Sequence, residues 1–314
     1  MASQTYELFG LTLESQLPLP DGLPSGSGTP DVRLRASGPE SEAQWAALDD
    51  ADQNEWFACR RLPDASTCLR WTGLFDFWVS ADGELIEYRK HRRASLESFT
   101  VYFLGQVLSF SLLARGIEPL HGSAVVVDGR TIVFLGACGA GKSTLAAAMI
   151  ARGYPAITDD VVVLRPSENA WVVEPGIPRL KLFPATARKL LGARDVTPMN
   201  TGTSKLVMTL AANEAVRRPT PLDTIFVLPE ATDAKNSAAS AVRIEPLAGA
   251  NAFLAIVRST FNGVITDRDR LANQFAFARR LTSSIRMRQL QYPRRLARLK
   301  NVCDSIVADL RDGS

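Results

Sequence analysis

The stretch of this sequence whose residues could bind a ligand or take part in catalysis most directly is a glycine-rich segment followed by a lysine, a serine and a threonine. The stretch reads Gly136-Ala137-Cys138-Gly139-Ala140-Gly141-Lys142-Ser143-Thr144. In a G-x-x-x-x-G-K-[ST] sequence the loop N–H groups curl around phosphate oxygens, the lysine reaches the terminal phosphates and the hydroxyl suits Mg²⁺. We therefore expect residues 136–144 to bind a nucleoside triphosphate, with Lys142 on the phosphates and Ser143 on the metal.

The residues on either side give this stretch the context that phosphate binding needs. An apolar run, 131–135, precedes it, and an alanine-rich run, 145–151, follows it. This order predicts a strand, a glycine loop and a helix, which places the loop amides at a helix N-terminus. It favours a nucleotide-binding loop over a glycine turn without a ligand.

Two adjacent carboxylates, Asp159 and Asp160, follow the glycine loop by one helix and one strand. Successive residues of a regular strand point to opposite faces, so the pair shares one site only where the strand ends or bends. Beside bound phosphates, such a pair suits a Mg²⁺ ligand and a base for an attacking hydroxyl. An acidic turn before a strand at 161–164 is the alternative.

Further charged residues follow in the predicted strand-turn-strand unit 171–183. Glu174 closes the first strand, where its carboxylate could reach a metal. Arg179 and Lys181 alternate with leucines, so both face one side, which is either solvent or phosphate. Eight basic residues and no acidic residue lie within 279–300, which predicts either a solvated face or a docking site for an acidic peptide or phosphate.

The chain before residue 95 reads as short strands separated by turns, and it predicts a small antiparallel β-rich domain over 1–94. The predicted strands are 6–13, 32–35, 56–60, 68–71, 75–79 and 85–88, with a hairpin turn at 82–83. Apolar residues then recur at helical spacing over 95–114, and we expect that helix to open the second domain, 95–314, and to lie against it.

The second domain is predicted to be α/β, because strands and helices alternate along it. The predicted strands are 120–127, 130–135, 161–164, 171–174, 179–183, 204–210, 224–228 and 285–291, and the predicted helices are 142–152, 184–192, 247–257, 267–282 and 293–310, the last with Pro293 in its first turn. Residues 128–129 form a hairpin turn, and 231–241 reads as a polar loop.

Composition limits the class of protein. The chain has 314 residues, of which 46% are hydrophobic, and a net charge of +3, which is too balanced to argue for a nucleic-acid partner. Four scattered cysteines and two histidines suggest neither a zinc site nor a disulfide framework, so we expect a reducing cytoplasmic setting. The N-terminus lacks a secretory pattern, and the uncharged run 98–114 is too short and too polar for a membrane span.

Several of these residues together resemble a known family. His121-Gly122, the glycine loop, Arg152-Gly153 and Asp159-Asp160, in this order, are similar to the C-terminal catalytic domain of HPr kinase/phosphorylase, over about residues 121–164. Segments 6–20, 120–124 and 175–182 are similar to HPr-kinase-related proteins of bacterial peptide-modification clusters, including lasso peptide kinases. The resemblance implies a P-loop kinase domain, with a mixed sheet and flanking helices, after a small N-terminal domain.

The resemblance also implies roles for individual residues. Lys142 and Ser143 would hold ATP and Mg²⁺, Asp159 would be the base toward a seryl hydroxyl, and Asp160 and Glu174 would assist the metal. His121 would lie beside the γ-phosphate or Asp159, although a single histidine is as often structural. Glu174 precedes Pro175-Gly176 where the family has Arg-Gly, which argues against phosphorolysis and against HPr as substrate.

The sequence therefore predicts an ATP-dependent serine kinase acting on a peptide or small protein, such as a lasso precursor peptide. A nucleotide-gated ATPase or assembly protein without an acceptor, a kinase of an HPr-like carrier and a small-molecule kinase stay open as alternatives. An ABC-type ATPase is disfavoured because the chain lacks an L-S-G-G-Q string. The sequence leaves open the acceptor, the base of the nucleotide and whether the chain forms a homo-oligomer.

Overall fold

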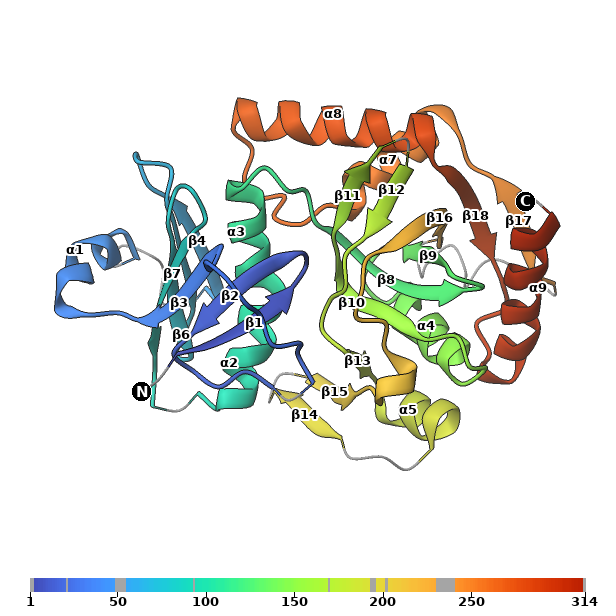
Figure 1. The fold of residues 1–314 in the computed structure, drawn as a ribbon, viewed down its shortest axis with the longest axis horizontal. Helices are drawn as coiled ribbons and strands as arrows, with labels where there is room; N and C mark the ends of the chain where they lie inside the picture. The colour runs from blue at the N-terminus through green and yellow to red at the C-terminus, as the bar shows by residue number, and fades with distance from the viewer. Residues whose placement is uncertain are drawn as a thin grey trace. The chain divides into compact units, whose positions relative to one another are not determined.

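The computed structural model describes residues 3–20, 22–48, 55–92, 94–168, 170–192, 196–200, 203–229 and 241–312. The chain divides into two compact units, Met1–Ile117 with Asn262–Ile265, and Glu118–Phe261 with Thr266–Ser314. Each unit combines sheet and helices, so the chain is mixed α/β, as Figure 1 shows. The predicted loop 231–241 lies almost wholly outside the described residues.

The N-terminal unit is built on a seven-stranded sheet in the order β1-β2-β3-β7-β6-β5-β4. Its strands are β1 Gln4–Leu8, β2 Leu11–Ser15, β3 Val32–Ala36, β4 Phe57–Arg61, β5 Thr67–Trp71, β6 Phe75–Val79 and β7 Leu85–Lys90. The predicted all-antiparallel arrangement is wrong, because β3 pairs parallel to both β2 and β7. A long connection joins β2 to β3, and the segment that contains β4, β5 and β6 separates β3 from β7. The predicted strand 6–13 is a hairpin with its turn at Phe9 and Gly10, both at positive φ.

One face of this sheet is apolar and is covered by a single helical segment. The segment comprises α2 Leu96–Tyr102, a π-helical stretch η3 Phe103–Val107 and α3 Leu108–Ala114. The Phe99 ring lies 5.1 Å from Phe77 and 5.9 Å from Phe75, and Tyr102 lies 5.0 Å from Trp71. This aromatic packing assigns the segment to the N-terminal unit, so the structural division falls after Ile117 and not at the predicted 94/95.

The same segment, Leu96–Ala114, is the one helix within the described residues that is long and apolar enough to cross a membrane. About two-thirds of its most apolar window, 67%, is buried inside the protein. A buried core helix can have the length and composition of a membrane-spanning helix. The ring contacts of Phe99 with Phe75 and Phe77 of the sheet show that this helix packs in the core.

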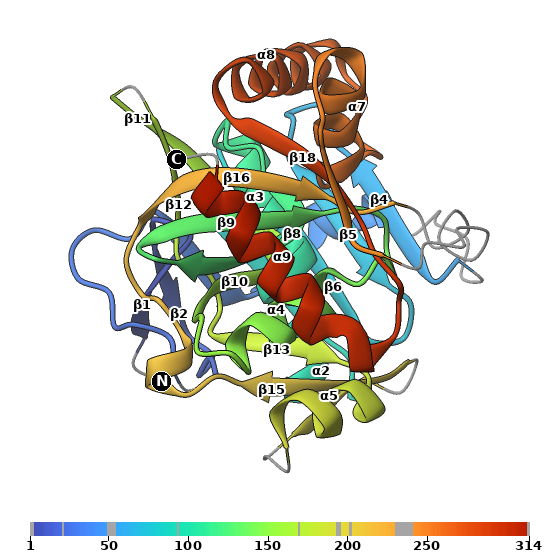
Figure 2. The same cartoon turned by 90° about the vertical axis from the view of Figure 1, so that its right-hand side faces the viewer.

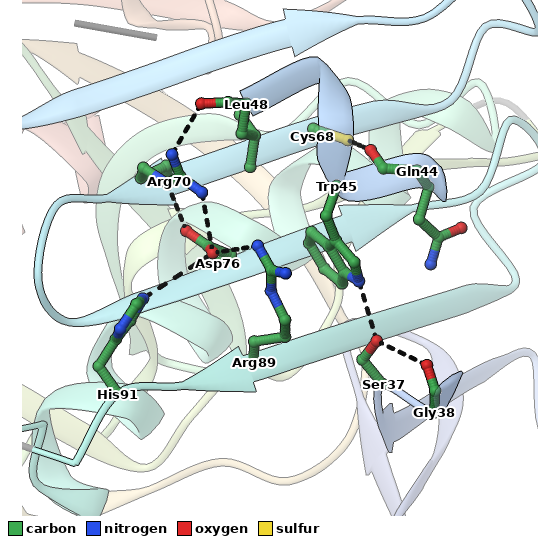
Figure 3. Close-up of polar contacts among 10 residues, drawn as sticks. All are labelled: Ser37, Gly38, Gln44, Trp45, Leu48, Cys68, Arg70, Asp76, Arg89 and His91. Carbon is green, nitrogen blue, oxygen red and sulfur yellow. Dashed lines mark hydrogen bonds and ion pairs between the residues drawn. The ribbon is translucent and has the colours of Figure 1, made fainter. Parts of the chain in front are cut away.

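The other face of the sheet carries a small apolar cluster, Trp45, Leu48 and Cys68, beside a buried polar network. Asp76, only 1% exposed, accepts hydrogen bonds from Arg70 Nε and Arg89 Nη2, both at 2.8 Å (Figure 3). The Arg89 guanidinium lies 4.4 Å from the centre of the Trp45 ring. Trp45 ends α1 Glu42–Trp45, which lies between the short turns η1 Pro39–Ser41 and η2 Ala46–Leu48. Ion pairs with Arg70 and Arg89 thus satisfy the buried Asp76 carboxylate on this face.

The C-terminal unit is built on an eight-stranded sheet in which β9, β16 and β18 are parallel neighbours. Its strands are β8 Leu120–Val127, β9 Arg130–Leu135, β10 Ala156–Val162, β11 Leu164–Ser167, β12 Ala170–Val173, β16 Thr220–Val227, β17 Arg243–Pro246 and β18 Arg286–Gln291. The predicted β8–β9 hairpin is confirmed, with its turn at Asp128-Gly129. The sequence did not indicate β17.

Helices cover both faces of this sheet. Ile132 and Phe134 of β9 face α4 Lys142–Ile150 and α9 Leu299–Asp312, whereas Val133 and Leu135 face α7 Gly249–Ser259 and α8 Arg268–Ser284. Figure 2 shows α9 and α4 in front of the strands. The predicted helix start at Pro293 is wrong: a short turn, η5 Leu296–Arg298, precedes α9, and Pro293 lies outside both. The result is a three-layer α/β/α arrangement.

A second, three-stranded sheet in the order β13-β15-β14 completes this unit. Its elements are β13 Arg179–Leu182, α5 Pro184–Leu191, β14 Thr197–Asn200 and β15 Thr203–Thr209, followed by the turn η4 Ala212–Glu214. Both strands of the predicted strand-turn-strand unit over 171–183 are present, but they do not pair with each other. β12 pairs in the large sheet and β13 in the small one, because the two prolines at 175 and 178 carry the chain away from the first strand.

Candidate active site

The glycine loop lies at the edge of the sheet where the parallel strands β9, β16 and β18 end. Ligands of open α/β sheets bind at this carboxyl edge. Leu228, just after β16, donates its N–H to Leu135 O at 2.8 Å. Arg294, which follows β18, donates to Gly139 O at 3.2 Å and to Pro229 O at 2.8 Å. One arginine thus joins the loop to the end of β16.

The backbone of the loop requires its glycines. Gly136, Gly139 and Gly141 have φ values of 147°, 78° and 100°, a region that other residues rarely adopt. A Cβ on Gly136 would lie 3.0 Å from Leu228 O, and one on Gly141 would lie 2.8 Å from the Tyr292 hydroxyl. The loop therefore runs directly into α4 in the strand-loop-helix order that the sequence predicts.

Lys142 begins α4, and its side chain folds back over the loop. Its ammonium donates to Gly136 O at 2.8 Å and to Ala137 O at 3.1 Å, and the residue is only 6% exposed. Burial lowers the pKa of Lys142, while the nearby Asp159 and Asp160 oppose that shift. The loop thus already holds a buried cation at the place where phosphate oxygens would bind.

The aspartate pair lies within β10, and that strand is irregular. Its register with β8 shifts between Ala156 and Thr158, and Asp160 has a positive φ of 69°. This bend lets both carboxylates serve one site, as the sequence analysis required, although the pair lies inside a strand and not in a turn before one. The strained φ of a non-glycine residue is itself typical of functional sites.

Asp159 is the residue that links the strand to the glycine loop. Its carboxylate accepts from Ser143 Oγ at 3.0 Å, Ser123 Oγ at 2.5 Å and the Lys181 N–H at 3.1 Å. Burial, followed by the charge of Asp160, raises its pKa to about 6, and the three hydrogen bonds oppose the shift. Lys142, Ser143 and Asp159 therefore lie together on one site.

Asp160 has different neighbours. Burial alone would raise its pKa, but its ion pair with Lys181 and the proximity of His121 lower it to about 2. His121 lies 3.2 Å from the Asp160 backbone oxygen through Nδ1, and its ring packs edge-on against Phe261. Burial, then the charge of Lys142, lowers the pKa of His121, so the imidazole is neutral at pH 7. His121 thus contacts Asp160 and not the carboxylate of Asp159.

Glu174, a predicted metal ligand, is 7% exposed, and its Oε1 lies 3.4 Å from Arg165 Nε. Burial raises its pKa, and Arg165 opposes the shift. Within the described ranges, no group of three or more His, Cys, Asp or Glu residues could hold a metal. A metal would therefore depend on a few oxygen ligands at the aspartate pair.

Arg179 and Lys181 do not face solvent, the first of the two predicted alternatives. Arg179 is 7% exposed, and Lys181 forms an ion pair with Asp160.

The eight basic residues of 279–300 do not form one common face: Arg286 and Arg288 bind Asp309, whereas Arg294 lies at the glycine loop. Two residues at the site were missed by the sequence analysis, Ser123 and Tyr292, whereas Arg294 belongs to the basic run 279–300 that it offered as a possible phosphate site. For Ser123, a hydroxyl inside an apolar strand was the available signal.

Comparisons with known proteins add little to this geometry. No family model matches the sequence, and no curated protein matches it. Among solved structures, the HPr(Ser) kinase/phosphatase from Coxiella burnetii is similar over 62% of this chain and 99% of that chain, with 14% sequence identity and a TM-score of 0.34. The assignment of the site rests on the hydrogen bonds and ion pairs described above.

Proposed function

We propose that the chain is an ATP-dependent kinase that transfers the γ-phosphoryl group to a seryl hydroxyl of a peptide or small protein, such as a lasso-type precursor. The observation that carries the proposal is the 3.0 Å hydrogen bond from Ser143 Oγ to Asp159 Oδ1. It joins the first turn of the helix after the glycine loop to the carboxylate pair. Phosphoryl transfer needs this combination of a phosphate cradle, a metal-binding hydroxyl and nearby carboxylates.

The residues present fit Mg²⁺. Mg²⁺ prefers one or two carboxylates, a hydroxyl and substrate phosphates over a cage made wholly of protein ligands. Ser143 and Asp159 offer that oxygen set, with Asp160 beside them. When bound, the ion would neutralise charge on the phosphates. Glu174 is the weaker candidate, because its carboxylate is paired with Arg165.

The contacts support an exchange of the roles that the resemblance implies for the two aspartates. Asp159 is already bonded to the Ser143 hydroxyl, which suits a residue that orders the metal site. Asp160 lacks that bond, and its pKa of about 2 depends on the ion pair with Lys181. Burial would raise that pKa once Lys181 moves away, which suits the residue that accepts the seryl proton. In this proposal Lys181 must release Asp160 when substrate binds. His121 holds the backbone at Asp160.

The test is mass spectrometry of serine-containing peptides incubated with the protein and Mg²⁺-ATP. Wild-type protein is expected to add a phosphoryl group, and Asp160→Asn to lose transfer by at least about 100-fold while keeping nucleotide affinity. Asp159→Asn is expected to weaken transfer and Mg²⁺-dependent binding together. Transfer at the wild-type rate by both variants would refute the proposal.

The same assay separates the alternatives. Release of phosphate from ATP at one rate with and without every peptide would identify a nucleotide-gated ATPase or assembly protein. Phosphorylation of an HPr-like carrier but of no peptide would identify a carrier kinase. A cytoplasmic location is part of the proposal, because the cysteines within the described residues are free thiols.

A further inference from the structure

At the candidate site, the Arg179 guanidinium has a buried hydrogen-bond donor with no partner among the described residues. The residue is 7% exposed, and this donor is its Nη2. Burying a guanidinium costs free energy unless its donors are satisfied. Burial lowers its pKa to about 10, so it stays charged at neutral pH. A buried guanidinium with a donor that no described residue occupies is suited to bind an anion.

The position of Arg179 on β13 explains where that donor points. Leu180 and Leu182 pack into the core beside α4, so Arg179 and Lys181 occupy the opposite face of the strand. Lys181 pairs with Asp160 on that face, and its backbone N–H bonds Asp159. Arg179 therefore faces the same site, and the charges of both aspartates act on it.

Positive charge exceeds negative charge at this site. Lys142 lies in the loop, Lys181 and Arg179 lie on β13, and Lys205 of β15 acts electrostatically on Asp160 and Lys142. Asp159 and Asp160 are the opposing carboxylates, and His121 is neutral at pH 7. A buried site with more cations than carboxylates attracts an anion.

We propose that Arg179 binds the oxygens of the phosphoryl group while it is transferred. This inference rests on the proposed kinase function and adds a catalytic residue to it. The bond from the γ-phosphorus to the bridging oxygen of ATP breaks, and the electron pair leaves with ADP. The bond from the seryl oxygen to phosphorus forms, and the seryl proton passes to Asp160. Arg179 donates to the equatorial oxygens, where charge is spread in the transition state.

The test compares binding of ADP alone with binding of ADP plus aluminium fluoride and Mg²⁺, because the aluminium fluoride complex imitates the transferring phosphoryl group. In wild-type protein, aluminium fluoride is expected to tighten ADP binding. In Arg179→Gln, ADP should bind within about twofold of wild type, but the tightening should fall by roughly 10- to 100-fold, as for a lost charge-assisted hydrogen bond. Arg179→Lys should lie between them, because lysine keeps the charge and loses the planar fork.

The matched control is Arg188→Gln, which removes an exposed arginine of α5, the helix that follows β13. It should keep the full fluoride effect. Arg179→Gln should fold at least as stably as wild type, because the replaced charge is buried with an unpartnered donor. Thermal unfolding checks this point. An unstable Arg179→Gln protein would assign the side chain a structural role and overturn the inference.

The outcomes separate the inference from the proposed function. Equal tightening in wild type and Arg179→Gln, or no tightening in wild type, overturns the role of Arg179 even where wild type phosphorylates a peptide. Loss of tightening in Arg179→Gln, with no phosphopeptide formed by wild type, keeps the anion site and removes the serine kinase function.

Discussion

Replacing Asp159 with asparagine should flatten the pH dependence of the stability of the protein without nucleotide. The carboxyl is 5% exposed, and its pKa rises from 3.8 to about 6 on folding, chiefly through burial and the charge of Asp160. A group whose folded pKa is raised stabilises the protein below its unfolded pKa, and that contribution is lost as pH rises through the folded pKa. Asparagine stays neutral and cannot contribute such a slope.

The magnitude follows from the shift. Two pKa units correspond to roughly 3 kcal/mol, so ionised Asp159 costs about 3 kcal/mol at pH 8 and about half of that at pH 5. The amide also loses an acceptor for Ser123, Ser143 or the Lys181 N–H, at a cost of about 1–3 kcal/mol that does not depend on pH. Relative to wild type, the variant should therefore gain roughly 1.5 kcal/mol between pH 5 and pH 8.

The assay is urea unfolding followed by circular dichroism at pH 5 and pH 8, with a metal chelator and without nucleotide. Glu245→Gln, an exposed carboxyl-to-amide change on β17 of the same unit, should keep the wild-type slope. With Mg²⁺-ATP present, the variant should gain less stability than wild type, because binding energy at the site depends on the carboxylate. A variant that loses stability from pH 5 to pH 8 as steeply as wild type would refute the assigned environment of Asp159.

Three further changes have expected outcomes. Gly141→Ala should lower ATP affinity by at least about tenfold in calorimetric titration, because φ is 100° and the new Cβ would lie 2.8 Å from the Tyr292 hydroxyl; unchanged affinity would contradict the loop geometry. Arg270→Met removes the partner 2.7 Å from buried Glu118, whose pKa burial already raises to about 7. Its loss of about 3–5 kcal/mol at pH 8 should shrink at pH 5, where Glu118 takes up a proton, and urea unfolding at the two pH values measures this. Asp76→Asn should destabilise the N-terminal unit by about 3 kcal/mol in thermal unfolding while ATP affinity stays unchanged, because Arg70 and Arg89 lose a buried charged acceptor.

The parts of the site that the sequence could predict are local in the chain. The glycine loop and the start of α4 are contiguous, so spacing alone indicates how residues 136–144 fold. The sequence also predicted that the strand ends or bends near Asp160, because two neighbouring carboxylates share a site only where a strand is irregular.

The parts that could not be predicted depend on tertiary packing. Ser123 meets Asp159 only through the register of β8 and β10, which residues far apart in the chain determine. β13 looks like the partner of β12 in the sequence, yet it pairs with β15 because its leucines complete the core beside α4. That choice also turns Arg179 toward the aspartates.

Two buried polar clusters in this chain show how a structural cluster differs from a binding site. Around Asp76, each donor that faces the carboxylate has found an acceptor, so the cluster holds the sheet together and has no need of a ligand (Figure 3). Around Asp159 and Asp160, the carboxylates are satisfied, but the cations exceed them and a donor of Arg179 is left over. Because a leftover buried donor costs free energy in the empty protein, binding of a phosphoryl anion should recover that cost. Part of the binding free energy for such an anion should therefore come from satisfying that donor.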